Sequence, residues 1–362
     1  MKKPKVMLDS GAYTAHRKGK EINIDKYADF ILQHGNEFES CFNLDSIGTG
    51  KDESKAKGTS KITTAEQSYL NWKYLNEKGV ETIPIYHLGT DEKWLKKYLE
   101  ESDYIGIGAI ANLDTNQRLL GLSNIWKTYL TDKNGMPSVK VHGLGLTAIE
   151  LMLRYPWYSV DSFTPVISAV WGSVLLPRLD NEGKPYFLDM KINKISDQGD
   201  HKENMENSYL NVPKRNKDVY ERMFEENGFL LGKIEYQERK DRRGKKGEQE
   251  RKPPRLPGFD LITPSDPKVK TLANSWEERM RWNLVMWNCL KRRLPIYPRP
   301  FEDREPEWEE VIHKKPKTKM FMGVSTMTHL DIFSMVLPKL DILISYAYMT
   351  PGIHEHIREY VK

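Results

Sequence analysis

The stretch Val6-Met7-Leu8-Asp9-Ser10-Gly11-Ala12-Tyr13 decides the fold of this chain. An apolar run leads directly into an acid, a hydroxyl and a glycine, as at the end of a buried strand. A second run, Tyr158-Ser159-Val160-Asp161-Ser162, ends in the same way. Parallel strands end at one edge of a sheet, and in barrels that edge carries the active site. We therefore expect Asp9 and Asp161 to lie at the same end of a parallel barrel.

The rest of the chain repeats this alternation of strand and helix. Eight apolar runs are predicted to be strands: 5–11, 40–46, 82–89, 104–110, 139–145, 158–163, 319–325 and 341–347. Their near-continuous apolar character suits strands that are buried on both faces. Helical patterns separate them, at 25–35, 64–78, 91–101, 115–130, 147–155 and 327–337. Repeated strand–helix units predict the α/β class and a (β/α)8 TIM barrel with right-handed crossovers.

The pattern is interrupted after the sixth strand. Residues 166–265 are polar, basic and punctuated by Pro and Gly, which predicts an insertion into the barrel. It separates the first six units, 1–165, from a closing part, 266–362, with a long helix and the last strands. Within 266–293 a helical stripe indicates core packing; it consists of Val269, Leu272, Trp276, Met280, Leu284 and Trp287.

The net charge of +5 is unevenly distributed. Between Arg239 and Arg255 there are nine Lys/Arg and three Asp/Glu, a surplus of six, so the remainder is near −1. A concentrated basic run attracts polyanions, although a solvated surface loop is the alternative interpretation. The residues expected to contact nucleic-acid phosphates are Arg239, Lys240, Arg242, Arg243, Lys245 and Lys246.

Composition restricts the class of protein. No run of 18 apolar residues exists, so no membrane span is expected, and the N-terminus lacks the apolar core of a signal peptide. Cys41 and Cys289 are the two cysteines, which excludes a disulfide framework and favours a reducing compartment. The predicted location is the cytoplasm.

Metal and dinucleotide sites are poorly supported. A structural zinc site usually takes four Cys/His ligands in close pairs, whereas His354 and His356 have no evident third ligand and are interpreted as surface residues. Residues 106–111 match the GxGxxA dinucleotide turn, but the predicted helix starts near Thr115 and no acid follows at the required distance. No metal and no cofactor are predicted, and nicotinamide or flavin binding is the lesser alternative.

The strand-end residues resemble those of a known family. Asp9-Ser10-Gly11-Ala12-Tyr13 is similar to the DSGG(F/Y) motif of queuine-type tRNA-guanine transglycosylases. The order that follows is also similar: Asp45, then His87 and Gly89, a glycine-rich fourth strand, Gly-Leu-Gly at 143–145, and Asp161. The similarity covers about residues 5–165 and the closing strands. The short form, with the run at 156–162, looks most like the phage and bacterial DNA-guanine transglycosylases, which insert 7-deazaguanine bases into DNA.

The resemblance implies a role for each strand-end residue. Asp161 stands at the position of the nucleophile, Asp9 at that of the general acid/base, and Asp45 at that of the acid that binds the N1/N2 edge of guanine. The other implied base-binding residues are Ser10, His87, Gly89, Gly108, Ala109, Gly143 and Gly145. His87 replaces the family's glutamine, so recognition of the base O6 is expected to differ or to depend on protonation.

The function implied is exchange of guanine in DNA for a 7-deazaguanine, preQ0 or a derivative, through a covalent aspartyl-glycosyl intermediate. DNA and the free base are the expected partners, and an oligomer or helper protein stays open. The family's three-Cys, one-His zinc motif is absent, which favours DNA over tRNA. The alternatives are tRNA exchange, a non-catalytic nucleic-acid-binding subunit and a TIM-barrel glycoside hydrolase. A phage-encoded enzyme of this kind acts in the host cytoplasm, where the modified bases let the DNA that carries them evade restriction.

Overall fold

The chain folds into two compact units in a computed structural model. Unit 1 comprises Met1–Phe163 and Asn288–Lys362, and unit 2 comprises Thr164–Trp287. The structure describes residues 4–47, 63–110, 113–197, 207–238, 259–262, 269–306, 308–313, 318–336 and 340–362. Among the helices of these ranges, none is long and apolar enough to cross a membrane.

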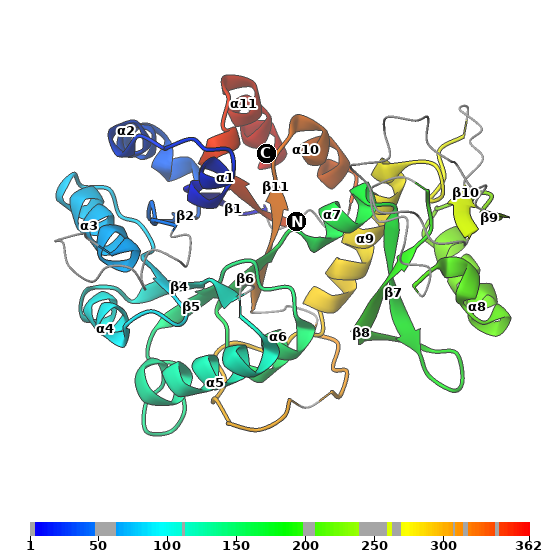
Figure 1. Cartoon of the computed structure of the whole chain (residues 1–362), viewed down its shortest axis with the longest axis horizontal. Helices are drawn as coiled ribbons and strands as arrows, with labels where there is room; N and C mark the ends of the chain where they lie inside the picture. Colours follow the sequence, from blue (N-terminus) through cyan, green and yellow to red (C-terminus); the bar gives the residue numbers. More distant parts are fainter. Residues whose placement is uncertain are drawn as a thin grey trace, which may run out of the picture. The chain divides into compact units, whose positions relative to one another are not determined.

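Unit 1 is built on one sheet of eight strands, all paired in parallel (Figure 1). The order across the sheet is β2-β1-β12-β11-β6-β5-β4-β3. The strands are β1 (Val6–Asp9), β2 (Ser40–Cys41), β3 (Ile85–His87), β4 (Tyr104–Gly108), β5 (Lys140–Gly143), β6 (Ser159–Ser162), β11 (Lys319–Val324) and β12 (Asp341–Ser345). All eight predicted strands are found in this sheet, which confirms the α/β class.

The sheet curls so that its two edge strands approach each other. Just after β2, Phe42 forms an isolated parallel bridge with Ile83, which precedes β3. The amide of Asn43 donates to the Ile83 carbonyl at 2.9 Å, and the amide of Ile83 donates to the Cys41 carbonyl at 2.8 Å. The seam is thus one bridge rather than a full ladder. This curled sheet is consistent with a TIM-like fold.

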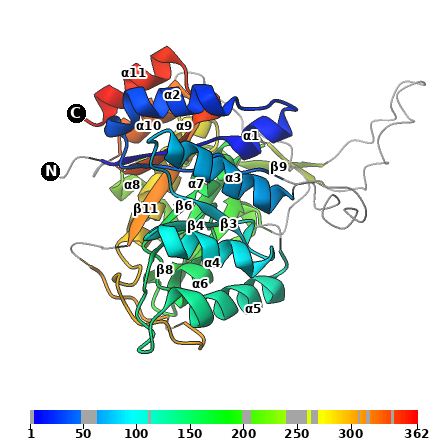
Figure 2. The ribbon, with the colours of Figure 1, turned by 90° about the vertical axis from the view of Figure 1, so that its left-hand side faces the viewer.

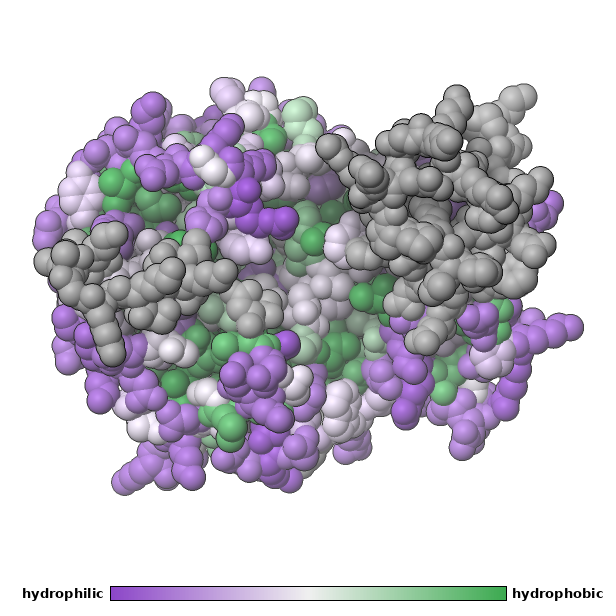
Figure 3. Space-filling model, viewed as in Figure 1, coloured by the Kyte–Doolittle hydropathy of each residue, from purple (hydrophilic) through white to green (hydrophobic). Residues whose placement is uncertain are grey.

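Helices lie outside the strands of unit 1 (Figures 1 and 2). They are α1 (Ala12–Arg17), α2 (Ile24–His34), α3 (Thr64–Glu77), α4 (Glu92–Glu101), α5 (Thr115–Ile125), α6 (Ile149–Arg154), α10 (Met327–Ser334) and α11 (Pro351–Tyr360). The side chains of Thr63, Asp91 and Asp114 cap α3, α4 and α5 by accepting from free backbone amides. Hydrophilic side chains cover much of the outer surface of these helices (Figure 3).

The core of unit 1 lies among the strands themselves. Met7, Phe42, Ile83, Ile85 and Phe321 are all buried and pack into one cluster. They come from β1, the two sides of the seam, β3 and β11. The cluster therefore joins strands from opposite ends of the sheet order, which stabilises the curl through apolar burial.

Unit 2 contains regular elements, of which the sequence patterns predicted only the long last helix. They are α7 (Thr164–Val170), β7 (Ser173–Leu179), β8 (Pro185–Lys194), α8 (Lys214–Glu226), β9 (Glu235–Glu238), β10 (Phe259–Ile262) and α9 (Trp276–Lys291), and the strands form two antiparallel pairs. In the β7–β8 turn, Asp180 accepts from the amides of Glu182 and Lys184, and Gly183 adopts a positive φ of 85°. Turn chemistry of this kind makes a polar, Gly-containing stretch part of a hairpin.

The long helix of unit 2 begins later than predicted. The stripe was expected to run from Val269, but α9 begins at Trp276. Thr271 and Asn274 exchange side-chain-to-amide hydrogen bonds, and the Leu272 amide donates to the Leu230 carbonyl. These contacts take the backbone out of helical geometry. Leu272 is buried outside the helix, and Val269 is 43% exposed.

Buried polar side chains of α9 bind the backbone of unit 2. Arg279, with no exposed surface, donates to the carbonyls of Ala169 and Leu272, each at 2.8 Å. Trp282 Nε1 donates to the Leu175 carbonyl at 2.8 Å. Asn283 accepts from the Leu175 amide at 2.8 Å and donates to two carbonyls. These bonds join α9 to the backbone of α7, of β7 and of the segment that precedes α9.

We predict that Asn283→Leu lowers the free energy of unfolding by about 2–4 kcal/mol, because buried backbone groups are left without partners. Urea denaturation monitored by circular dichroism measures the change. Asn227→Leu is the matched control, at an exposed residue after α8 whose side chain makes one hydrogen bond, and it is expected to change stability by less than about 1 kcal/mol. Equal effects of the two variants would contradict the role assigned to Asn283.

Candidate active site

Three carboxylates from three strands come together at the carboxyl end of the sheet in unit 1. Asp9 is the last residue of β1, Asp161 lies in β6, and Asp45 follows β2. Asp45 and Asp161 both act electrostatically on Asp9. The structure thus brings together Asp9 and Asp161, which were predicted to share an edge, and Asp45, the third acid predicted for this site.

Asp9 holds its proton more tightly than an ordinary aspartate. Burial, followed by repulsion from Asp45 and Asp161, raises its pKa from 3.8 to about 7, although the Gly11 amide donates to its Oδ2 at 3.0 Å. Gly11 has a φ of 78°, and a Cβ there would lie 2.4 Å from Ser345 Oγ. The glycine of the motif is therefore required, and Asp9 carries a proton much of the time at neutral pH.

Asp45 is paired with His87, another of the predicted base-binding residues. His87 Nε2 lies 2.9 Å from Asp45 Oδ2, and the Ser10 hydroxyl is 3.5 Å from Oδ1. The Asp45 and His87 side chains are 10% and 16% exposed. A Cβ on Gly108 would lie 3.0 Å from His87 Cδ2, so this glycine makes room for the imidazole. Ser10, Asp45, His87 and Gly108 thus form one polar cluster.

The hydrogen bonds that Asp161 makes with described residues all fall on one of its two carboxylate oxygens. Its Oδ1 accepts from the Gly145 amide at 2.7 Å and lies 3.1 Å from His142 Nε2. Gly145 adopts a positive φ of 60°, which aims its amide at the carboxylate. Within the described ranges every hydrogen bond of Asp161 falls on Oδ1. Oδ2 is therefore the oxygen that can attack an electrophile.

The remaining predicted backbone positions differ in what surrounds them. Ala109 has a φ of 62°, unusual for a residue with a side chain, and such strain is typical of functional sites. Gly89 also has a positive φ, of 95°. A Cβ on Gly143 would lie 3.0 Å from Leu146 and 3.3 Å from Trp157, so packing alone accounts for this glycine. Base contact by these residues stays a prediction.

Sequence reasoning missed a buried polar chain behind Asp161. His142 of β5 and Ser159 of β6 have no exposed surface, and Tyr104 of β4 lies beside them. The signal was available: a histidine interrupts the apolar run 139–145, and a serine interrupts 158–163.

The predicted phosphate-binding residues Arg239, Lys240, Arg242, Arg243, Lys245 and Lys246 lie outside the described residues.

The chain matches no known protein family, no characterised protein and no solved structure. The resemblance to guanine transglycosylases accordingly depends on the strand-end residues themselves. Any function must therefore be inferred from the geometry of these residues and not from a related protein.

A second cluster lies where α11 meets the short helix η1 (Gly35–Glu37). His34, Glu37 and His354 bring their ligand atoms within 4.8 Å of one another. His354 is 9% exposed, so its interpretation as a surface residue was wrong. Arg358 donates to both Glu37 oxygens, each at 2.7 Å, and lowers the pKa of Glu37 to about 2. A guanidinium on both oxygens leaves this carboxylate poorly suited to a metal ion.

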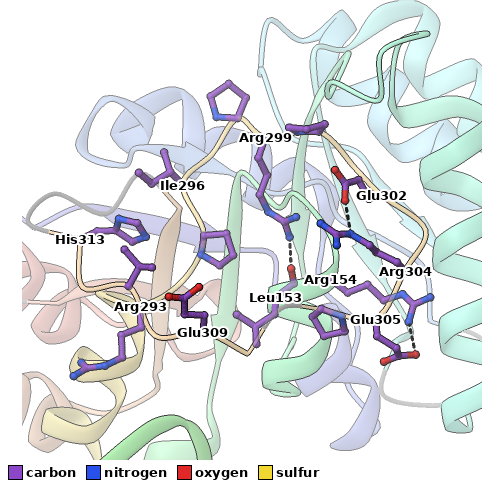
Figure 4. A pocket seen from close by; sticks show the side chains of 15 residues that line it. Leu153, Arg154, Arg293, Ile296, Arg299, Glu302, Arg304, Glu305, Glu309 and His313 are labelled. Atoms are coloured by element: carbon purple, nitrogen blue, oxygen red, sulfur yellow. Dashed lines mark hydrogen bonds and ion pairs between the residues drawn. The ribbon is translucent and has the colours of Figure 1, made fainter.

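A pocket of about 500 Å³ lies among residues 153–154 and 293–313 (Figure 4). Both segments lead into the amino ends of strands, β6 and β11, so the pocket lies away from the end that carries Asp161. Three of its arginines are paired with glutamates: Arg154 with Glu305, Arg304 with Glu302, and Arg293 with Glu310. The fourth, Arg299, donates to the Leu153 carbonyl. Each of the four arginines that line the pocket thus has a partner within the protein.

We predict that Asp9→Asn stabilises the protein increasingly as pH rises. The folded-state pKa of Asp9 lies above its unfolded value of 3.8, so between about pH 4 and 7 the folded wild type binds more protons and loses stability with rising pH. The variant lacks this titration. Its advantage over wild type should grow by up to about 4 kcal/mol across that window and level off above it.

Chemical denaturation at a series of pH values measures this difference. Asp103→Asn is the control, because the Asp103 side chain is 86% exposed. Its stability difference from wild type should vary less with pH than that of Asp9→Asn. A flat difference for Asp9→Asn would show that Asp9 titrates normally.

Proposed function

We propose that this chain is a transglycosylase that exchanges guanine in DNA for a 7-deazaguanine base, preQ0 or a derivative. The observation that carries the proposal is the contrast between two neighbouring aspartates. Asp9 has a pKa raised to about 7, as a general acid/base requires. Asp161 has its Oδ1 held by N–H groups, and its Oδ2 makes no hydrogen bond with the residues that the structure describes. Such a pair divides one difficult displacement into two easier ones.

In the first half-reaction, Asp161 replaces guanine on the sugar. Asp161 Oδ2 attacks C1′, so that the C1′–O bond forms while the C1′–N9 bond breaks. The proton of Asp9 passes to the departing guanine. The products are a glycosyl ester on Asp161, an intact DNA strand and free guanine.

In the second half-reaction, the incoming base reverses these steps. Asp9, now ionised, removes the N9 proton of the 7-deazaguanine, and N9 attacks C1′. The C1′–O bond to Asp161 breaks and restores its carboxylate. Two inversions at C1′ retain the β linkage.

The polar cluster of Ser10, Asp45 and His87 beside the two aspartates suits the edge of a guanine-like base. Asp45 supplies carboxylate acceptors for N–H groups such as N1–H and the exocyclic amine, and Ser10 supplies a hydroxyl. His87, hydrogen-bonded to Asp45, is the group proposed to recognise O6. A bound base replaces the contacts that these three side chains make with one another.

The fold proposed together with this function is a (β/α)8 TIM barrel with a basic insertion after the sixth strand. Eight parallel strands and the Phe42–Ile83 bridge across the seam support it. In a barrel the carboxyl ends of all strands face one site. The target guanine must leave the stack to reach such a site, by base flipping or from single-stranded DNA.

The substrate and setting proposed are DNA in the cytoplasm, of the host if the chain is phage-encoded. The absence of a three-Cys, one-His zinc motif in a chain with two cysteines is what favours DNA over tRNA. An oligomer or a helper protein is compatible with this function.

We predict that wild-type protein incorporates labelled guanine and labelled preQ0 into duplex DNA and that Asp161→Asn abolishes incorporation, because the amide is not a nucleophile. A protein–DNA adduct on a denaturing gel reports the covalent intermediate. Asp103→Asn, an exposed acid, is expected to retain full activity. An adduct formed by Asp161→Asn would remove Asp161 from its role.

Parallel reactions with tRNA test the substrate. Label in tRNA alone would keep the mechanism and overturn the choice of DNA. Label in neither nucleic acid would overturn the proposed function.

We also predict that deletion of residues 239–255 weakens DNA binding and its salt dependence. For each phosphate that the protein no longer neutralises, the slope of log K against log salt should fall by about 0.9, or by up to about 5 for six phosphates. Fluorescence anisotropy with labelled duplex over a range of salt concentrations measures the slope, and circular dichroism checks that the protein stays folded. An unchanged slope would assign DNA binding to another surface.

A further inference from the structure

We propose that His142, Ser159 and Tyr104 form a buried relay that positions Asp161 for attack, with His142 as the residue that fixes the carboxylate. Its catalytic consequence rests on the proposed function, whereas its geometry stands independently. The three residues come from β5, β6 and β4, all within unit 1.

The relay is continuous from the carboxylate into the interior of the sheet. His142 Nε2 lies 3.1 Å from Asp161 Oδ1, and His142 Nδ1 lies 2.6 Å from Ser159 Oγ. Ser159 Oγ is in turn 2.6 Å from the Tyr104 hydroxyl. His142 and Ser159 have no exposed surface, so each polar atom depends on its neighbour for a hydrogen bond.

The carboxylate sets the donor-to-acceptor direction of every hydrogen bond in the relay. The oxygens of an ionised carboxylate can only accept hydrogen bonds. The nitrogen that contacts Asp161 Oδ1, His142 Nε2, must then carry a hydrogen and act as the donor. In neutral His142, Nδ1 then accepts from the Ser159 hydroxyl, which accepts from the Tyr104 hydroxyl. Every donor meets an acceptor in this arrangement, which selects the Nε2–H tautomer.

Rigid packing holds the imidazole in place. The ring of Phe42 lies 4.9 Å from that of His142, and the ring of Phe321 lies 6.4 Å away. Both phenylalanines belong to the buried apolar cluster of the sheet. The donor to Asp161 is thus fixed by the barrel-like core rather than by a loop.

Holding Oδ1 of Asp161 in place also fixes the position of Oδ2. His142 and the Gly145 amide bind the same oxygen, so the carboxylate cannot rotate without breaking both bonds. In the proposed ester, Oδ1 becomes the carbonyl oxygen and still accepts from both donors. The relay therefore holds Asp161 in place both before and after the attack. An apolar residue at position 142 would fill the same space but could not donate a hydrogen bond to Asp161.

The test compares two substitutions at one position. His142→Leu removes the donor, and its kcat for guanine exchange should fall roughly 100-fold with KM nearly unchanged. His142→Gln has an amide N–H the same number of bonds from Cβ as Nε2, so it should recover part of the activity. Ser159→Ala should reduce kcat less than His142→Leu.

His354→Leu is the matched control. His354 is also a buried histidine that bonds a carboxylate, Glu37, at 3.0 Å, but in another part of unit 1. Its kcat should match wild type. Equal reductions of kcat in His142→Leu and His142→Gln would reduce His142 to a packing role and overturn the proposal.

A second measurement does not depend on activity. Nitrogen-15 NMR of histidine-labelled wild-type protein should show one imidazole, absent from His142→Gln, that is protonated at Nε2 and accepts at Nδ1. Ser159→Ala and Tyr104→Phe should shift its Nδ1 signal. A proton on Nδ1 alone, or no shift in Ser159→Ala, would overturn the relay even in an active enzyme. The expected signals in a wild-type protein without exchange activity would instead overturn the proposed function and, with it, the catalytic role of the relay.

Discussion

Repulsion between carboxylates brought together in one partly buried cluster is the constraint on which the site depends. Asp9, Asp45 and Asp161 converge where parallel strands end, and three charges cannot be held there without compensation. Each is stabilised differently: Asp9 by a proton, Asp45 by His87, and Asp161 by His142 and a backbone amide. Chemically identical side chains thereby acquire different properties, which is how one site can contain both an acid and a nucleophile.

The apolar core and the polar site share the same residues of the sheet. Phe42 bridges the seam to Ile83, accepts a hydrogen bond from Tyr27 through its carbonyl, and packs its ring against His142. Curling the sheet and fixing the imidazole are thus consequences of one packing arrangement. Close-packed interiors transmit small displacements, so the geometry at Asp161 depends on the whole curled sheet.

Predictions from periodicity succeeded where local signals and tertiary contacts agree. The eight strands are continuous apolar runs, and burial on both faces is what such runs require. Prediction failed where local hydrogen bonds competed with periodicity: Thr271 and Asn274 delay α9, and the Asp180 turn makes a hairpin in a polar stretch. His354 was misjudged because its partners, His34 and Glu37, lie more than 300 residues away.

The sequence by itself determined the order of strands and helices, and it placed Asp9 and Asp161 at strand ends. Parallel pairing then puts both at one edge, because every strand runs in the same direction. Only the tertiary structure decided the proton on Asp9, the histidine that binds Asp161 and the pairing of Asp45 with His87. Those properties depend on burial and on distances of about 3 Å between residues far apart in the chain, and no local pattern encodes such distances.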